Sequence, residues 1–374
     1  MNRLKTKNIT YIFGSGRKEK LLSDEEFPKE FFYSYFDMAD KALELDFIEF
    51  NDKNNNKMYI FVDKVLRKIS KLSFFTNSIT SRSNFKQIRK SDIIVATNDR
   101  IGLSILPMLL LVKIYKKIDV YVFVMGLFSN QSNKKYIKFM QRSILILFSR
   151  LTTQFIFLGN PEKEKAELSF PNYKNKFSFI PFSIDTDFWS SDKDIDFDNK
   201  TGILFVGNDS FRDYRFVTQL ASEMQEYEFT FITSQINKDQ VISNNVKLIN
   251  GKWNKSLLTD IELKNIYESS RLTILPLKET IQPSGQSVAL QSMNVGTPVL
   301  ITKTSGFWDK MSYENYKNIV FITNNEINTW REAIESTYGN TKSLEKLSAF
   351  GMTTIKNNYT LKLFNDKFIN ILNN

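Results

Sequence analysis

The sequence of 374 residues contains no cysteine and no histidine. Without cysteine, the chain can form neither a disulfide nor a metal site made of thiolates. Without histidine, it lacks the most common general base and the most common ligand of transition metals. Any catalysis must therefore use carboxylates, lysine, arginine, tyrosine, hydroxyl groups or the substrate itself.

The chain also lacks a long apolar run. No stretch approaches the roughly 18 apolar residues that a membrane-spanning helix needs. The opening sequence MNRLKTKNITYIFGSG reaches a glycine loop after a short apolar run, which is not the pattern of a signal peptide. Internal repeats, zinc patterns, Walker loops and nucleophile elbows are absent too. We expect a cytoplasmic protein, with the inner face of the membrane as the alternative location.

Positive charge is in excess, with 51 lysines and arginines against 41 acidic residues, a net charge of +10. Such a balance favours an acidic partner, such as nucleotide phosphates, anionic lipid or nucleic acid, although a solvated lysine-rich surface explains it equally. No motif combines basic residues with stacking aromatics, so we predict no nucleic-acid partner.

The length and the 42% apolar content favour two domains of ordinary size. Short apolar runs alternate with helical patterns along the chain, which predicts an α/β fold with parallel sheets. The polar, acidic stretch 190–200 has no apolar periodicity and is typical of a linker. We predict a first domain of residues 1–189 joined by the C-terminal helix 359–374, and a second domain of residues 201–358.

Local patterns predict further elements. Phe27–Leu43 is an aromatic-rich helix candidate, and Gly102–Ile114 is a helix interrupted near Pro107. Residues 57–90 and 134–151 mix lysine and arginine with large apolar side chains at helical spacing. A basic amphipathic helix of this kind lies either at a membrane surface or against the protein core.

The most informative stretch is Leu275–Trp308, which reads as strand, loop, helix and strand. A loop rich in turn-forming residues follows the first apolar run, and Gly296 falls where a helix ending in a left-handed residue needs glycine. A helix beginning after such a loop has unpaired N–H groups, which attract phosphate. The same residues also fit an ordinary turn between a strand and a helix.

Residues Pro283–Val299, read as PSGQSVALQSMNVGTPV, resemble the donor-binding segment of the retaining family-4 glycosyltransferases, which have the GT-B fold. That family has E-G-F-G-L-x-x-L-E-A-M-A-x-G-x-P-V in the same frame. Pro283 and Gln291 stand where the family has glutamates; Glu279 and Gln282 are the candidates to replace the first. The stretch 183–189, SIDTDFW, resembles the family's V-D-T-x-x-F at the end of its first domain.

The resemblance extends to Gly207–Arg215, where the family has V-G-R-L-x-x-x-K-G. In the family, the arginine and the lysine of this motif bind the donor diphosphate. Asn208 stands at the family's arginine and Arg212 at its lysine, while Arg215 is a candidate replacement for the lost arginine. The resemblance implies Glu279 and Arg212 as catalytic residues. The implied donor-binding residues are Gly207, Asn208, Arg212, Arg215, Gln282, Ser284, Gly285, Gln286, Ser287 and Gln291.

In the first domain, the resemblance implies a cleft or acceptor side at the ends of strands. Its candidate residues are Gly14, Gly16, Asn98, Arg100, Met125 and Gly126. Many family members have histidine where Met125 stands, so that role does not carry over. A loop at 250–254 is expected near the nucleotide base.

The resemblance implies two Rossmann-like doubly wound domains across a cleft. It also implies transfer of a sugar from a nucleotide diphosphate sugar, with UDP or GDP, to a hydroxyl of a glycan or lipid-linked acceptor. We expect retention of configuration and no metal or other cofactor. Three alternatives stay open: a nucleotide-sugar epimerase, a phosphorylase, and a catalytically silent protein of this fold that binds an anionic or protein partner.

Overall fold

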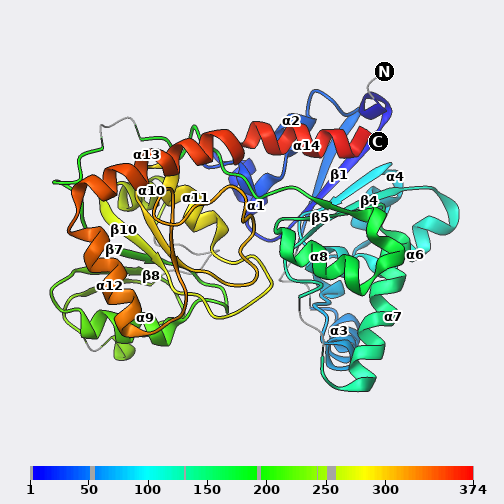
Figure 1. Ribbon diagram of the computed structural model, residues 1–374. Helices are drawn as coiled ribbons and strands as arrows, with labels where there is room; N and C mark the ends of the chain where they lie inside the picture. Colours follow the sequence, from blue (N-terminus) through cyan, green and yellow to red (C-terminus); the bar gives the residue numbers. More distant parts are fainter. Residues whose placement is uncertain are drawn as a thin grey trace. The chain divides into compact units, whose positions relative to one another are not determined.

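The computed structural model describes residues 3–50, 55–129, 132–191, 195–241, 243–250 and 258–373 (Figure 1). The chain forms two compact units, each with its own parallel sheet. Unit 1 comprises Met1–Glu25, Phe31–Ile180 and Asn365–Asn374. Unit 2 comprises the short segment Glu26–Glu30 and the long segment Pro181–Phe364.

Unit 1 is built on six parallel strands in the order β2-β1-β3-β4-β5-β6. The strands are β1 (Asn8–Phe13), β2 (Glu44–Glu49), β3 (Ile93–Ala96), β4 (Asp119–Val124), β5 (Gln154–Phe157) and β6 (Phe177–Phe179). The α-helices of this unit are α1 (Arg17–Leu21), α2 (Tyr35–Met38), α3 (Lys57–Ser70), α4 (Arg82–Lys90), α5 (Asp99–Ser104), α6 (Leu106–Tyr115), α7 (Lys135–Leu151) and α8 (Asn160–Ser169). Short 3₁₀ turns are η1 (Arg3–Thr6), η3 (Thr76–Ser78) and η4 (Pro171–Lys176).

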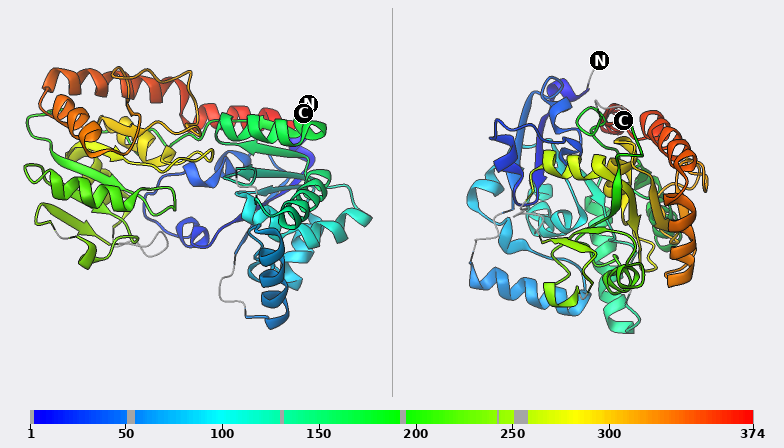
Figure 2. Two further views of the ribbon diagram at one scale, coloured as in Figure 1. Left: turned by 60° about the horizontal axis from the view of Figure 1, so that its bottom comes forward. Right: turned by 90° about the vertical axis from the view of Figure 1, so that its left-hand side faces the viewer.

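Burial explains why these apolar runs form strands. Every residue of β3 is buried, as expected for a central strand whose two faces are both covered by helices (Figure 2). The register of the strands also matches this burial, because buried residues are paired across the sheet. Ile9 of β1, for example, is paired with Ile93 of β3. The core of the unit joins residues of the sheet such as Val122 and Phe155 to helix residues such as Phe148.

Unit 2 has six parallel strands in the order β12-β11-β10-β7-β8-β9, the doubly wound arrangement of a Rossmann fold. The strands are β7 (Thr201–Val206), β8 (Phe229–Ile232), β9 (Val246–Ile249), β10 (Ser270–Leu275), β11 (Val299–Thr302) and β12 (Val320–Ile322). The helices are α9 (Tyr214–Glu223), α10 (Asp260–Ser269), α11 (Gln286–Asn294), α12 (Ile327–Tyr338) and α13 (Thr341–Asn358), with the 3₁₀ turn η5 (Lys238–Gln240).

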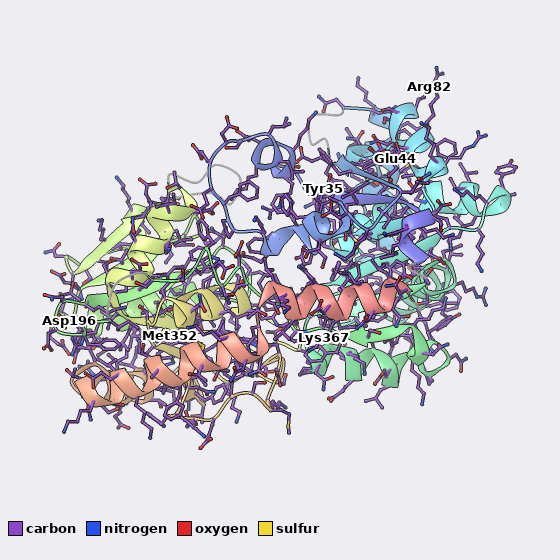
Figure 3. All side chains as sticks on the ribbon, turned by 90° about the horizontal axis from the view of Figure 1, so that it is seen from above. Tyr35, Glu44, Arg82, Asp196, Met352 and Lys367 are labelled. Atoms are coloured by element: carbon purple, nitrogen blue, oxygen red, sulfur yellow. The ribbon has the colours of Figure 1, made fainter. Side chains whose placement is uncertain are left out.

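The last helix, α14 (Leu361–Asn373), begins in unit 2 and contributes its residues from Asn365 onward to unit 1. Phe368 packs against Tyr121 and Phe123 of β4, so the end of the chain is part of the core of unit 1. Figure 3 labels Met352 on α13 and Lys367 on α14. The predicted interruption at Asn357–Tyr359 is confirmed, because α13 ends at Asn358.

Most predicted elements are confirmed, including the interruption near Pro107, where α5 gives way to α6. The single helix expected over Phe27–Leu43 is wrong. The structure has only the 3₁₀ turn η2 (Glu30–Phe32) and the one-turn α2 there. Tyr33 and Ser34 have φ of 48° and 69°, which a right-handed helix cannot contain. Sequence reasoning also missed α8. No described helix is long and apolar enough to cross a bilayer.

Candidate functional site

Two loops of unit 2 meet at the carboxyl edge of its sheet. The strands β7 and β10 are parallel neighbours, so the loops that follow them begin at the same edge. Arg212, in the first loop, forms a β-bridge with Leu277 in the second. The amide N of Asp213 donates to the carbonyl of Pro276 at 3.0 Å, and that of Lys278 donates to Phe211 at 2.8 Å. The two loops therefore form one hydrogen-bonded layer.

The side chain of Arg212 lies inside this layer and is only 2% exposed. Its Nε donates to the carbonyl of Val206 at 3.2 Å, and one terminal nitrogen donates to Ser284 Oγ at 2.9 Å. The same nitrogen is 2.9 Å from a carboxylate oxygen of Asp209. A buried cation needs such partners, because desolvation penalises an unpaired charge by several kcal/mol.

Two glycines make room for this guanidinium. A Cβ at Gly207 would lie 2.5 Å from Arg212 Nε, which is closer than real contacts allow. A Cβ at Gly285 would lie 3.7 Å from a terminal nitrogen of Arg212, so Gly285 borders the guanidinium on another side. The predicted residues Gly207, Arg212, Ser284 and Gly285 are thus brought together in the structure.

Helix α11 begins at this cluster. Gly285 has φ of 83° and is the N-cap residue of the helix; as a glycine it has no side chain that could cap the first N–H groups. Gln286 is buried and Ser287 is half-buried in the first turn. The start of a helix carries a partial positive charge, and here the Arg212 cation lies beside it. Both features attract an anion, and Asp209, on the exposed side, is the negative charge that partly balances them.

Asn208 and Arg215 have different surroundings. The side-chain oxygen of Asn208 accepts from the amide N of Ser234 at 2.6 Å and from its Oγ at 3.0 Å, which ties the loop after β7 to the loop after β8. Arg215 is exposed in the first turn of α9. Asn208 therefore shapes the loop, while the charge of Arg215 faces solvent.

Gln291 is 5% exposed, and its amide is engaged by protein groups. Its nitrogen donates to a carboxylate oxygen of Glu30 at 2.9 Å, and its oxygen lies 3.4 Å from the hydroxyl of Tyr267. The sequence-based expectation was a contact with ribose or sugar hydroxyls. In the structure the amide is held instead by a carboxyl group that local sequence patterns did not single out.

Glu30 is the centre of this buried polar cluster and belongs to unit 2. The indole N–H of Trp189 donates to the carboxyl oxygen that also receives Gln291, at 2.9 Å. The other oxygen receives the amide N of Asp185 at 3.3 Å. Burial raises the pKa of Glu30 to about 7, and the hydrogen bonds from Gln291, Trp189 and Asp185 partly oppose that rise.

Glu279 and Gln282 lie in the loop after β10. Glu279 is exposed, and its carboxylate accepts from the amide N of Ser305 at 3.1 Å and from the Ser305 hydroxyl. The amide N of Gln282 donates to Thr280 Oγ1 at 3.0 Å. Over the described part of the chain, no hydrogen bond joins Glu279 to the Arg212 cluster. Its catalytic role stays a prediction.

The candidate residues of unit 1 follow β1, β3 and β4, which are adjacent strands. A Cβ at Gly14 would meet nothing within 4 Å, and Gly16, with φ of 90°, caps α1. Asn98 caps α5 by accepting from Ile101 N at 2.8 Å. The guanidinium of Arg100 stacks on Phe75, 3.6 Å from the ring centre. These residues gather at one edge of the sheet.

The loop after β4 rests on a buried carboxyl group, Glu162 of α8, that sequence reasoning missed. The amide N of Gly126 donates to it at 3.0 Å, and that of Phe128 at 3.1 Å. Met125 N donates to Asp99 at 2.8 Å. Burial, and secondarily the charge of Asp99, raise the pKa of Glu162 to about 8. The expected base-binding loop at 250–254 lies, apart from Asn250, outside the described residues.

No protein-family model and no curated protein matches the sequence. Solved structures do match over nearly the whole chain. Anabaena HepE, in complex with UDP and glucose, aligns with a TM-score of 0.67 at 11% identity, over 98% of this chain and 99% of that chain. Sucrose-phosphate synthase from Thermosynechococcus elongatus aligns with a TM-score of 0.64 at 10% identity, over 98% of each chain. A glycosyltransferase from Rickettsia africae gives 0.61 at 12%, over 98% of this chain and 97% of that one.

The chain has the GT-B fold. Both six-stranded parallel sheets take part in these alignments, because they span almost the full length of each chain. The predicted fold class is therefore confirmed. Identities of 10–12% show the fold alone. Any inference about activity must therefore be argued from the side chains of this chain.

Proposed function

We propose that this protein is a glycosyltransferase that moves a sugar from a nucleotide diphosphate sugar to an acceptor hydroxyl. The observation that carries the proposal is Arg212, a buried cation held beside Gly285, the N-cap residue of α11. A diphosphate is the anion that suits such a site, because its oxygens accept several N–H groups at once and the guanidinium offsets part of its charge. The UDP complexes of Anabaena HepE support the proposal.

The chemistry needs little more than charge stabilisation. As the acceptor oxygen bonds to the anomeric carbon, the bond from that carbon to the diphosphate oxygen breaks, and negative charge grows on the diphosphate. Arg212 and the N–H groups at the start of α11 stabilise that charge. The acceptor proton passes to the departing phosphate, so the absence of histidine is no obstacle. Retention of configuration, a UDP or GDP donor, a glycan or lipid-linked acceptor and independence of metal ions belong to the same proposal.

Ser287 offers a sharp test. Replacing this half-buried residue of the first turn by aspartate adds a negative charge where the diphosphate would lie. An acidic residue in a first turn stabilises the helix itself, so the variant should fold normally. We expect UDP or GDP to raise the melting temperature of the unaltered protein, since a ligand at about one hundred times its Kd adds about 2.7 kcal/mol. In Ser287→Asp that shift should vanish.

Ser287→Asn is the matched control, because it has nearly the same shape without the charge. Arg212→Gln should also abolish the shift, whereas Arg331→Ala on α12 should not. A panel of UDP, GDP and ADP identifies the base. Unaltered nucleotide binding by Ser287→Asp and by Arg212→Gln would disprove the proposed phosphate site.

A second function is favoured by one observation. Gln291, which stands where the related glycosyltransferases have a glutamate, is buried and bound to Glu30 rather than open to a ligand. A catalytically silent protein of this fold that binds an anionic or protein partner would tolerate such a change. Release of free sugar from UDP-glucose or GDP-mannose without an acceptor separates the two: an active enzyme hydrolyses its donor slowly, and a silent protein only binds nucleotide.

A further inference from the structure

Helix α3 exposes four large apolar side chains and buries a carboxylate. Phe61 is 67% exposed and Met58 is 62% exposed, while Val62 and Val65 are about 40% exposed. By contrast, Asp63 is 3% exposed. A surface helix usually has the opposite arrangement, with its apolar stripe on the core.

Hydrogen bonds explain why the helix lies this way round. The carboxylate of Asp63 accepts from the amide N and the hydroxyl of Thr76, at 2.9 and 2.6 Å, and from the amide N of Asn77 at 3.0 Å. Three donors compensate for the burial of this charge. On the same side of the helix, Leu66 packs against the core of the unit, and the buried Ser70 hydroxyl is satisfied within the helix by the carbonyl of Leu66 at 2.6 Å. The outward position of Phe61 thus follows from strong contacts on the other face.

The outward face combines the apolar stripe with a row of cations. At 3.6 residues per turn, positions 58, 61, 62 and 65 fall within an arc of about 100°, and positions 57, 64 and 68 fall within an adjoining arc of about 40°. Those three positions are exposed lysines. The only acidic residue of α3 is Asp63, which faces inward. No negative charge of the helix therefore opposes an anionic partner.

Helix α7 extends the same chemistry. It packs against α3, and the two helices lie side by side in unit 1 (Figures 1 and 2). Its first turns expose Tyr136 by 63% and Phe139 by 69%, next to the exposed Lys135 and Lys138. The helix contains no acidic residue. Aromatic side chains among lysines are the composition of helices that lie in a membrane interface.

We propose that α3 and the first turns of α7 bind the surface of an anionic lipid bilayer, with Phe61 and its apolar neighbours in the boundary between headgroups and acyl chains. The lysines meet the lipid phosphates. Exposed apolar side chains by themselves would fit many partners, but cations that flank the stripe fit a negatively charged surface. This inference does not depend on the proposed glycosyl transfer.

The test is cosedimentation of the full chain with vesicles. We expect binding to phosphatidylcholine vesicles that contain about one-third phosphatidylglycerol, weak binding to pure phosphatidylcholine, and loss of binding at high salt. Phe61→Ser with Val65→Ser should weaken binding at least tenfold. Each of Lys64→Gln and Lys68→Gln should weaken it about fivefold. The control is Leu168→Ser on α8, an apolar position that is even more exposed than Phe61, which should bind normally.

Depth can be measured directly, because the chain has no cysteine and a single introduced one takes a spin label specifically. A label on Val62→Cys, which keeps Phe61, should become protected from aqueous relaxation agents when anionic vesicles are added, and a label on Leu168→Cys should not. Equal binding to neutral and anionic vesicles, or no effect of the Phe61 and Val65 changes, would overturn the proposal. So would self-association in solution that disappears in Phe61→Ser, which would make the partner a second copy of the chain.

Discussion

Replacing Glu30 by glutamine should destabilise the protein at acidic pH and stabilise it at basic pH. The carboxyl group is buried, and its pKa is raised from 4.5 to about 7. Below pH 4.5 the group is protonated in both the folded and the unfolded protein and has no effect on the pH dependence. Between pH 4.5 and 7 the unfolded chain loses this proton while the folded chain keeps it, so stability falls as pH rises.

The magnitude follows from the two pKa values. Their difference of about 2.5, at about 1.36 kcal/mol for each pH unit, corresponds to about 3 kcal/mol of lost stability above pH 7. Glutamine does not titrate, so the variant escapes this loss. Its new amide N–H₂, however, would face the amide N of Asp185, which donates to a carboxyl oxygen at 3.3 Å in the unaltered protein. That mismatch costs about 1–2 kcal/mol at every pH.

The variant should therefore be less stable than the unaltered protein at pH 5 and more stable at pH 8. We expect the difference between the two free energies of unfolding to change by about 2–3 kcal/mol over this range. Urea unfolding at several pH values measures it, followed by tryptophan fluorescence, to which Trp189, hydrogen-bonded to Glu30, contributes as one of four tryptophans. Glu345→Gln, at an exposed position of α13, controls for the loss of one carboxylate. A constant difference from pH 5 to 8 would refute the reasoning.

Three further predictions concern other buried groups. Gly207→Ala places a Cβ 2.5 Å from Arg212 Nε, which should lower stability by about 1–3 kcal/mol and weaken nucleotide binding. Thermal melts with and without UDP measure both effects. Gly14→Ala, whose Cβ would have nothing within 4 Å, should be neutral in the same melts. Asp63→Asn leaves at least one of three donors facing an N–H₂ group and should cost about 1–3 kcal/mol in urea unfolding; an unchanged midpoint would contradict the role given to this carboxylate. Burial lowers the pKa of Lys200 to about 8, so the unaltered protein should gain stability relative to Lys200→Met as pH rises from 8 to 10.5, and parallel curves would argue against a buried ammonium.

Local sequence patterns predicted the unit from β10 to β11 because each signal lies within a few residues of the next. The apolar run, the loop with Gly285, the helical spacing and Gly296, with φ of 81°, are all found as expected. The family resemblance put Gly207 and Arg212 in one site, and the structure brings them together, but only the structure shows that the guanidinium is buried against Ser284.

Contacts across long stretches of chain were out of reach. Gln291 looked like a ligand-binding residue, yet its partner Glu30 lies 261 positions away and comes from a segment expected to be helix. The same segment shows how tertiary context overrides local preference. This segment was expected to be an aromatic-rich helix, but Tyr33 and Ser34 adopt positive φ, and Tyr33 packs against Phe123 of β4.

The sequence by itself determined that the chain forms parallel α/β sheets without disulfides, because strand and helix periodicity and the absence of cysteine are local properties. Tertiary structure decided which side chains are buried together. It turned Asp63 inward and Phe61 outward on α3, and it brought the carboxyl group of Glu30 within hydrogen-bonding distance of Gln291 on α11. The physical reason is that desolvating a charge is tolerable only where donors converge on it, and the donors here come from parts of the chain that only folding brings together.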